Sequence, residues 1–286
     1  MSKTLSNFAI FIMVYGRPDK MWTLQSLRKA GYTGKVYFVA STDDSRLDGY
    51  RLEYGKDLLV FSKDDVASEM DPGDNSGDLR STMFAANTIF SLAKDVGVEY
   101  FMIMCDDYLS FSYKFNTEYK FAQSPIRDLD SVLAAMLEYY KKTSFLTLAM
   151  GQGGDYIGGK NNQMGKMVRT RRKAMNSFIC SVNRPFKFIG RLNEDVTTYV
   201  NLGGRGYIFL TLMQVALDQQ PSQKIKGGLT EVYLDGGTYL KSFFSLMYNP
   251  SCIKVACMGK KRRIHHKVYW NNAVPKIIQA EYKKAR

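Results

Sequence analysis

Two neighbouring acidic residues follow an apolar segment in the first half of the chain. Residues 99–105 (EYFMIMC) predict a buried strand, and Asp106 and Asp107 come directly after it. In an open parallel sheet, ligands bind beyond the carboxyl ends of the strands. Two adjacent carboxylates at that position suit a hard divalent cation, which can bridge the oxygens of a diphosphate. The alternative is a solvated turn with two acids, and the placement after a buried strand favours the cation site.

A second acidic pair, Glu194 and Asp195, lies within otherwise basic sequence. Acids in the first turn of a helix are stabilised by the helix dipole, so the pair could be structural. A carboxylate can instead take a proton from the hydroxyl of an acceptor. Because this is the only acidic cluster between two basic stretches of the chain, we interpret it as a source of the general base.

Three further side chains are candidates for binding anions or metals. His265 and His266 are neighbours and follow the basic residues 260–263, with Ile264 between. Neutral imidazole is a common ligand of transition metals, but the same pair could contact phosphate or lie at the surface, and these residues alone leave the choice open. Arg80 stands near the start of a long expected helix, where it could bind an anion or lie at the surface. The chain has no P-loop and no GxGxxG motif, so phosphates are not held in those ways.

An alternation of strands and helices must position these residues. In the first half, strands are expected over residues 8–15, 35–40, 58–61 and 99–105, and helices over 20–30 and 78–96, with Asp78 as N-cap of the latter. This alternation predicts a parallel α/β sheet of doubly wound type. Two of the strand ends carry polar residues suited to a ligand site, namely Tyr15, Gly16, Arg17, Thr42 and Asp43.

The second half continues the mixed α/β pattern. A helix is expected over residues 131–142, strands over 145–150, 174–182 and 230–234, and a final helix over 274–284. Residues 207–219 fit either a strand or a helix, and the Gly- and Asn-rich residues 151–165 indicate a mobile loop. The simplest organisation is one mixed α/β unit over residues 1–286.

The composition fits a folded, non-membrane chain. Of the 286 residues, 45% are apolar and 23% charged, which excludes a disordered chain. No run reaches about 18 apolar residues and no secretory signal is visible, so neither a membrane span nor export is expected. Four scattered cysteines without metal-ligand spacing indicate a reduced, cytoplasmic protein.

The charge is strongly positive and unevenly distributed. Forty Lys and Arg against 27 Asp and Glu give a net charge of +13, and the excess lies in residues 151–191 and 254–286. Excess like charge costs self-repulsion unless a partner neutralises it, so we favour a nucleic-acid partner over a plain solvated surface. The candidate DNA-binding residues are Lys160, Arg169, Arg171, Arg172, Lys173, Lys260, Lys261, Arg262 and Arg263.

The order of these motifs resembles a GT-A type nucleotide-sugar glycosyltransferase. More narrowly, the segments DLRSTMFAANTIF, MIMCDDY, NEDVTTYV and HHKVYWNNAVPKII look like the phage-encoded TET/JBP-associated DNA base glycosyltransferases. The resemblance spans most of the chain, and it rests on the order and spacing of short motifs. It implies a GT-A-like, mainly parallel mixed sheet flanked by helices. Residues 1–110 would form the nucleotide-sugar-binding half and residues 111–286 the acceptor-binding half.

The resemblance also implies roles for individual residues. Asp107 would be the metal ligand of the family's Asp-x-Asp motif, completed by His265 or His266. The first Asp of the common pattern is replaced here by Cys105. Asp195, or failing that Glu194, would be the base of an inverting transfer. The residues expected to bind the donor are Tyr15, Gly16, Arg17, Thr42, Asp43, Arg80 and Asp106.

The expected activity is then transfer of a sugar from a UDP-sugar to 5-hydroxymethylcytosine in DNA, with Mn²⁺ or Mg²⁺. In a phage, such hypermodification would protect DNA against host nucleases. Three alternatives stay open: a GT-A enzyme acting on a protein or polysaccharide, a nucleotidyltransferase, and a non-enzymatic DNA-binding protein.

Overall fold

The computed structural model describes residues 5–152, 156, 177–220, 229–237, 239–258, 262–274, 277, 280 and 283. The strands are β1 (Phe8–Met13), β2 (Lys35–Ser41), β3 (Leu58–Phe61), β4 (Tyr100–Cys105), β5 (Tyr108–Phe115), β6 (Phe121–Pro125), β7 (Thr147–Gln152), β8 (Phe178–Ser181), β9 (Phe209–Gln219), β10 (Ile253–Met258) and β11 (Arg263–Val268). The helices are α1 (Trp22–Lys29), α2 (Leu47–Tyr54), α3 (Lys63–Ala67), α4 (Thr82–Asp95), α5 (Leu129–Lys141), α6 (Glu194–Gly204), α7 (Leu229–Gly236), α8 (Leu240–Tyr248) and α9 (Trp270–Ala273), with a short 3₁₀ turn at Gly55–Asp57.

One mixed sheet organises the described part of the chain. Its nine strands lie in the order β3-β2-β1-β4-β8-β7-β9-β5-β6, and β10 pairs with β11 in a separate antiparallel hairpin. The strands β3, β2, β1 and β4 are all parallel. Only β8 and β5 of this sheet run against the other strands. The expected mixed, mainly parallel sheet is therefore confirmed.

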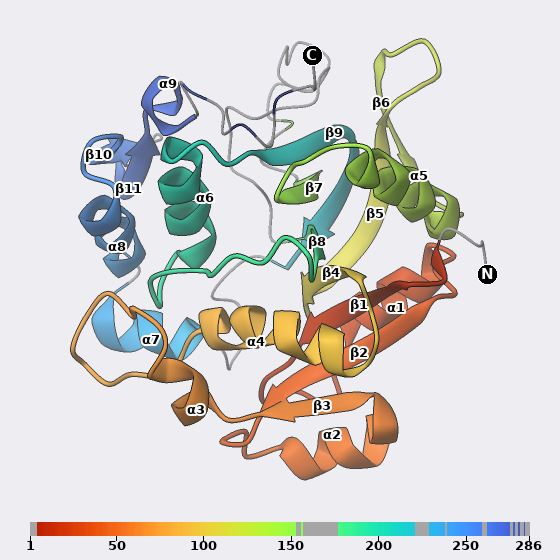
Figure 1. Ribbon diagram of the computed structural model, residues 1–286, viewed down its shortest axis with the longest axis horizontal. Helices are drawn as coiled ribbons and strands as arrows, with labels where there is room; N and C mark the ends of the chain where they lie inside the picture. Colours follow the sequence, from red (N-terminus) through yellow and green to blue (C-terminus); the bar gives the residue numbers. More distant parts are fainter. Residues whose placement is uncertain are drawn as a thin grey trace.

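Both faces of the sheet are covered by helices (Figure 1). Alternate residues of a strand point to opposite sides, so each central strand feeds two cores. In β1, Ile10 and Ile12 belong to the core that includes α1 and α5, whereas Ala9 and Phe11 belong to the core that includes α4 and α6. A strand buried on both faces needs apolar side chains throughout, which explains why β1 is one continuous apolar run.

The sequence located most elements and misplaced one helix start. Every strand and helix expected between residues 8 and 105 is present within a few residues of its expected bounds, and most of residues 207–219 forms strand β9, which begins at Phe209. Asp78 is not the N-cap of α4, because the hydroxyl of Ser81 accepts the N–H of Met83 at 3.0 Å. The carboxylate of Asp78 instead accepts hydrogen bonds from Arg80.

The strand expected at residues 230–234 was wrong, since this segment belongs to helix α7. Leu229, Val232 and Tyr233 recur at helical spacing and pack with Leu192 and Phe244. The β-branched and aromatic residues of the segment favour a strand locally, but burial of this helical face decides the outcome. Most of the expected loop at 151–165 and of the expected helix at 274–284 lies outside the described residues.

Within the described residues, no helix has both the length and the apolar character needed to span a bilayer.

Two glycines end helices in the same way but in different surroundings. Gly31 follows α1 and Gly97 follows α4, with φ of +88° and +71°. A Cβ on Gly31 would lie 2.3 Å from the carbonyl oxygen of Arg127, whereas a Cβ on Gly97 would meet nothing within 4 Å.

We expect Gly97→Ala to cost about 1 kcal/mol of unfolding free energy from the left-handed backbone alone. Gly31→Ala should cost about 1–3 kcal/mol more, because the backbone at Arg127, just before α5, must move away from the added methyl group. Chemical denaturation of both variants measures the difference. Equal costs would mean that the contact at Arg127 relaxes freely.

Candidate active site

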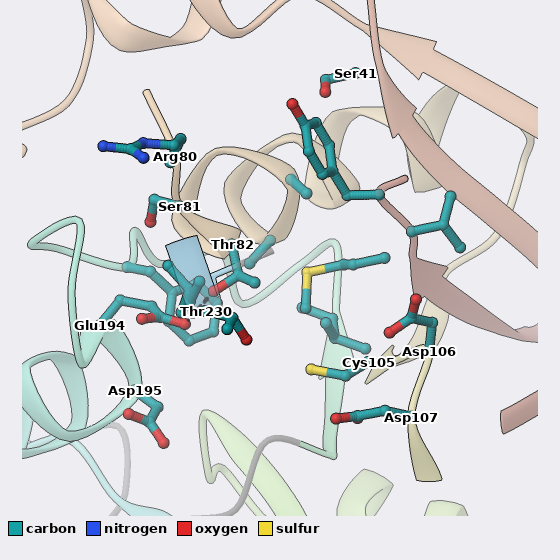
Figure 2. A pocket seen from close by; sticks show the side chains of 18 of the residues that line it. Ser41, Arg80, Ser81, Thr82, Cys105, Asp106, Asp107, Glu194, Asp195 and Thr230 are labelled. Carbon is teal, nitrogen blue, oxygen red and sulfur yellow. Dashed lines mark hydrogen bonds between the residues drawn. The ribbon is translucent and has the colours of Figure 1, made fainter. Parts of the chain in front are cut away.

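A cavity of about 300 Å³ opens where the carboxyl ends of β1 and β4 meet the N-terminal ends of α4, α6 and α7. Figure 2 shows the two acidic pairs on opposite sides of this cavity. Asp106 and Asp107 follow β4, and Glu194 and Asp195 begin α6. The edge of the sheet expected to bind a ligand therefore lines a cavity that contains both pairs.

The turn that carries Asp106 and Asp107 is fixed by a buried threonine of α1. The hydroxyl of Thr23 donates to the carbonyl of Cys105 at 2.6 Å and accepts the N–H of Tyr108 at 2.9 Å. The N–H of Thr23 donates to the carbonyl of Asp106 at 3.2 Å. These three bonds tie the end of β4 to the start of α1, so the backbone that carries the two carboxylates is fixed at the cavity.

The charges of the two carboxylates are only partly compensated. Arg17 contacts Oδ1 of Asp106 at 2.7 Å, and Oδ2 of Asp106 is buried without a hydrogen-bond partner among the described residues. Burial raises the pKa of Asp106 to about 6, against the lowering effect of Arg17 and with a further increase from Asp107. Burial also raises the pKa of Asp107, whose oxygens accept from the amide of Gln219 at 3.0 and 3.2 Å.

The opposite wall is the first turn of α6. Asn193 precedes the helix in a left-handed conformation, with φ of +57°. The Thr82 hydroxyl, from the start of α4, donates to the carboxylate of Glu194. Asp195 is 8% exposed, and its Oδ1 accepts the N–H of Val196 at 2.7 Å. Two carboxylates therefore line the cavity at a helix N-terminus.

Arg80 links two walls of the cavity. Its guanidinium contacts Asp78 at 3.0 Å and Asp235 of α7 at 2.7 Å, and both carboxylates hold the pKa of Arg80 above its usual value. Asp78 also pairs with Arg191 at 3.2 Å. The hydrogen bonds from Arg80 keep the pKa of Asp78 below its usual range. The arginine is thus anchored at Asp78, while its second partner, Asp235, lies on an exposed part of α7.

The structure brings together seven of the residues that the sequence suggested for the site. The cavity is lined by Tyr15, Arg17, Arg80, Asp106, Asp107, Glu194 and Asp195, with Cys105 beside them. Burial and the two neighbouring aspartates raise the pKa of the Cys105 thiol, which keeps it neutral near pH 7.

Gly16, Thr42 and Asp43 are not among the lining residues. Gly16 donates its N–H to Asp44 at 2.8 Å. Asp43 pairs with Lys63 at 2.8 Å, and that lysine lines the cavity with its ammonium 4.6 Å from the centre of the Tyr15 ring. Asp43 therefore does not line the cavity itself but pairs with Lys63, which does.

The two histidines also stand outside the lining. Both belong to β11, and Nδ1 of His266 lies 3.4 Å from Nδ2 of Asn193, which does line the cavity. His265 is exposed. Their expected role as metal ligands stays a prediction.

Sequence reasoning missed the wall formed by α7 and the end of β9. Thr230, Glu231 and Tyr233 line the cavity, as does Gln219. Burial raises the pKa of Tyr233, with a further increase from Glu194 and Asp195. Gln219 ends an apolar run, so the rule that ligands bind at strand ends could have identified it. Thr230 to Tyr233 gave no such signal, because the segment was expected to be a strand.

Much of the basic sequence lies outside the described residues, including Lys160, Arg169, Arg171, Arg172, Lys173, Lys260 and Lys261. Arg262 and Arg263 are described and exposed. Arg191 ends the first basic stretch, residues 151–191. It is 5% exposed and pairs with Asp74 at 2.8 Å, so this cation has a structural role.

The residues at the end of β4 fit a divalent cation. The buried, unpartnered Oδ2 of Asp106 lies in the same turn as the carboxylate of Asp107, and one arginine faces the two negative charges. Among the described residues, no cluster of three or more His, Cys, Asp or Glu is arranged to hold a metal ion. Mg²⁺ is commonly bound by one or two carboxylates together with substrate phosphates, so this pair suits a cation that arrives with its ligand.

Several solved structures are similar to this chain at low sequence identity. Glucosyl-3-phosphoglycerate synthase from Mycobacterium tuberculosis, in complex with Mg²⁺ and UDP, has a TM-score of 0.46 and 9% identity, with 92% of this chain and 87% of that chain covered. A fragment of S. aureus TarS in complex with UDP has a TM-score of 0.45 and 11% identity, with coverages of 86% and 66%. A mannosyltransferase from Pyrobaculum calidifontis, in complex with GDP-Man and Mn²⁺, has a TM-score of 0.46 and 13% identity, with coverages of 76% and 58%.

Family membership rests on the sequence and not on these likenesses. No curated protein is similar enough in sequence to count as a match. The model of one family, the TET-associated glycosyltransferases, matches residues 8–228. This range is well over half of the chain and includes the turn after β4 and the start of α6, where the two acidic pairs stand. The chain therefore belongs to the TET-associated glycosyltransferase family and is a glycosyltransferase.

Proposed function

We propose that this protein transfers a sugar from a UDP-sugar to 5-hydroxymethylcytosine in DNA. The observation that carries the proposal is the pair of acidic clusters on opposite sides of one cavity, one suited to a cation and the other to a base. Family membership supports sugar transfer. A nucleotidyltransferase and a non-enzymatic DNA-binding protein are set aside on the same ground.

The donor would bind at the end of β4. Asp107, with Asp106 beside it, would hold Mn²⁺ or Mg²⁺ together with the diphosphate, and the cation would neutralise the charge of the leaving nucleoside diphosphate. Arg17 keeps Asp106 in place. Arg80 would contact the diphosphate or the sugar from the start of α4, exchanging its exposed partner Asp235 for the ligand. The Tyr15 ring and Lys63 line the remainder of this side.

The acceptor would be activated from the opposite wall. Asp195, or failing that Glu194, would take the proton of the incoming hydroxymethyl oxygen as that oxygen attacks the anomeric carbon. The transition state would carry oxocarbenium character, as in glycoside hydrolysis. Glu194 is engaged by Thr82, whereas Asp195 bonds to its own helix N-terminus, so Asp195 is the better candidate for the base.

The acceptor is inferred from family and charge. The family description links it to TET, and the net charge of +13 fits a polyanion. Residues 1–110 would hold the donor and residues 111–286 the acceptor, with Lys160, Arg169, Arg171, Arg172 and Lys173 as DNA contacts. In a phage, the product would protect DNA from host nucleases. A protein or polysaccharide acceptor is the second candidate, and the charge argues against it.

Asp107→Asn should lower sugar transfer by about 100-fold or more, because charge stabilisation by a metal is worth several kcal/mol and each 1.4 kcal/mol is tenfold in rate. The measurement is mass spectrometry of nucleosides from 5-hydroxymethylcytosine DNA incubated with protein, Mn²⁺ and a panel of UDP-sugars. Asp48→Asn, at a fully exposed carboxylate on α2, is the matched control and should keep wild-type activity. Wild-type protein that modifies no base with any donor of the panel would refute the proposed function.

Asp195→Asn should lower kcat by about 10²–10⁴-fold without changing the affinity for UDP, because the base acts on the acceptor and not on the donor. Glu194→Gln is the companion variant. It should lower kcat less, since its partner Thr82 can still donate to the amide oxygen. Steady-state kinetics with saturating UDP-sugar, together with calorimetric UDP binding, separates the two. A wild-type kcat in both variants would remove the α6 pair from the mechanism.

Asp106→Asn should stabilise the metal-free protein above pH 6 while impairing transfer. The pKa of Asp106 rises from 3.8 to about 6 on folding, so the folded state binds the proton more tightly and stability falls as pH rises from about 4 to 6. The amide removes this cost, which is about 1–3 kcal/mol at pH 7.5 and fades below pH 5. Chemical denaturation at several pH values measures it, with Asp48→Asn as control. Destabilisation at pH 7.5 would show that the bond to Arg17 outweighs burial.

A further inference from the structure

The β10–β11 hairpin exposes cations that have no acidic residue close to them in the sequence. Between Asp235 and Glu281 the sequence contains no Asp or Glu. Lys254, Arg262, Arg263 and Lys267 are exposed, and none of them forms an ion pair with a described residue. A hairpin of this kind differs from a mixed-charge surface, where acids and bases alternate and compensate each other.

Two of these cations are forced together by the strand register. Lys254 of β10 lies directly opposite Lys267 of β11. Their ammonium groups both lie over the ring of Tyr269, at 5.6 and 5.4 Å from its centre. Like charges directly opposite each other on neighbouring strands destabilise a hairpin. An anionic partner placed over this face would relieve the repulsion.

The other side of the hairpin connects it to the cavity. In β11, exposure alternates, with Arg263, His265 and Lys267 exposed and the residues between them half-buried. His266, on the half-buried side, lies beside Asn193 at the cavity wall. The hairpin packs on α8, and α8 packs on α6, whose first turn carries Asp195 (Figure 1). A ligand bound along the exposed face would therefore lie across the hairpin from the wall that holds the expected base.

We propose that the β10–β11 hairpin is a two-stranded ribbon that lies in the major groove of duplex DNA. This inference rests on the proposed function for its acceptor. The major groove is about 12 Å wide and admits a two-stranded ribbon. The C5 substituent of cytosine also lies in the major groove, so a ribbon there is on the side of the duplex that carries the hydroxymethyl group. The hairpin lies beyond residue 228, where the family match ends.

The test is the double variant Lys254→Gln/Lys267→Gln, with binding to a 20-base-pair 5-hydroxymethylcytosine duplex measured by fluorescence anisotropy across a salt series. The slope of log K against log[salt] should become less steep by about 1.8, since each phosphate contact contributes about 0.9. The matched control is Lys29→Gln/Lys94→Gln, which removes the same charge from exposed last-turn positions of α1 and α4 and should keep the wild-type slope. Thermal shift by UDP with Mn²⁺ should be equal in all three proteins, which shows an intact donor site.

Three results would overturn the ribbon. An unchanged slope in the hairpin variant, with wild-type protein still modifying the DNA, would exclude the hairpin and leave the proposed function standing. Equal loss of slope with a single strand of the same sequence would exclude the groove placement. If wild-type protein neither binds nor modifies the duplex, the proposed function fails, and the ribbon with it.

Discussion

The site depends on two adjacent carboxylates being kept at the buried end of β4. Burial of this pair is unfavourable, as the raised pKa values of Asp106 and Asp107 show, and one arginine offsets only part of the cost. The fold tolerates this cost because hydrogen bonds with Thr23 of α1 fix the backbone of the turn, so the two acids cannot move apart freely. A bound cation would relieve the same excess negative charge. The unfavourable burial of the two carboxylates would therefore favour binding of the cation together with the proposed donor.

The remaining walls follow from that turn. Gln219 reaches Asp107 from the end of β9, which ties the acidic turn to the far half of the sheet. Thr82 of α4 contacts Glu194 of α6, so the two helices that flank the cavity share one polar contact. The acidic pairs are consequently fixed relative to each other by the sheet and by α4. The proposed inverting transfer would need this, because its leaving group and its nucleophile would lie on opposite sides of one carbon.

Sequence patterns predicted the strands and helices that frame the site and its acids, but not the wall formed by α7. Periodicity found β1, β4 and α4, because a doubly buried strand and an amphipathic helix leave strong local signals. The acids were found since strand ends are where a parallel sheet binds ligands. Helix α7 was missed because its local preference and its tertiary packing disagree, with Val232 and Tyr233 packed on Leu192 and Phe244. The partner of Arg80, Asp235, could not be predicted, since the contact joins residues 155 positions apart.

Several acids of the chain neutralise cations that are buried in the fold. Asp74 and Asp78 pair with the buried Arg191, and Asp43 pairs with the buried Lys63. Those carboxylates neutralise structural cations and therefore cannot offset the basic C-terminal sequence. The positive charge of the β10–β11 hairpin is thus not balanced by these carboxylates, and its field acts on whatever approaches the cavity from the side of α8. Acidic clusters in the cavity beside a basic hairpin separate the attraction for a cation from the attraction for a polyanion, so the proposed donor and acceptor would be drawn to different surfaces of one site.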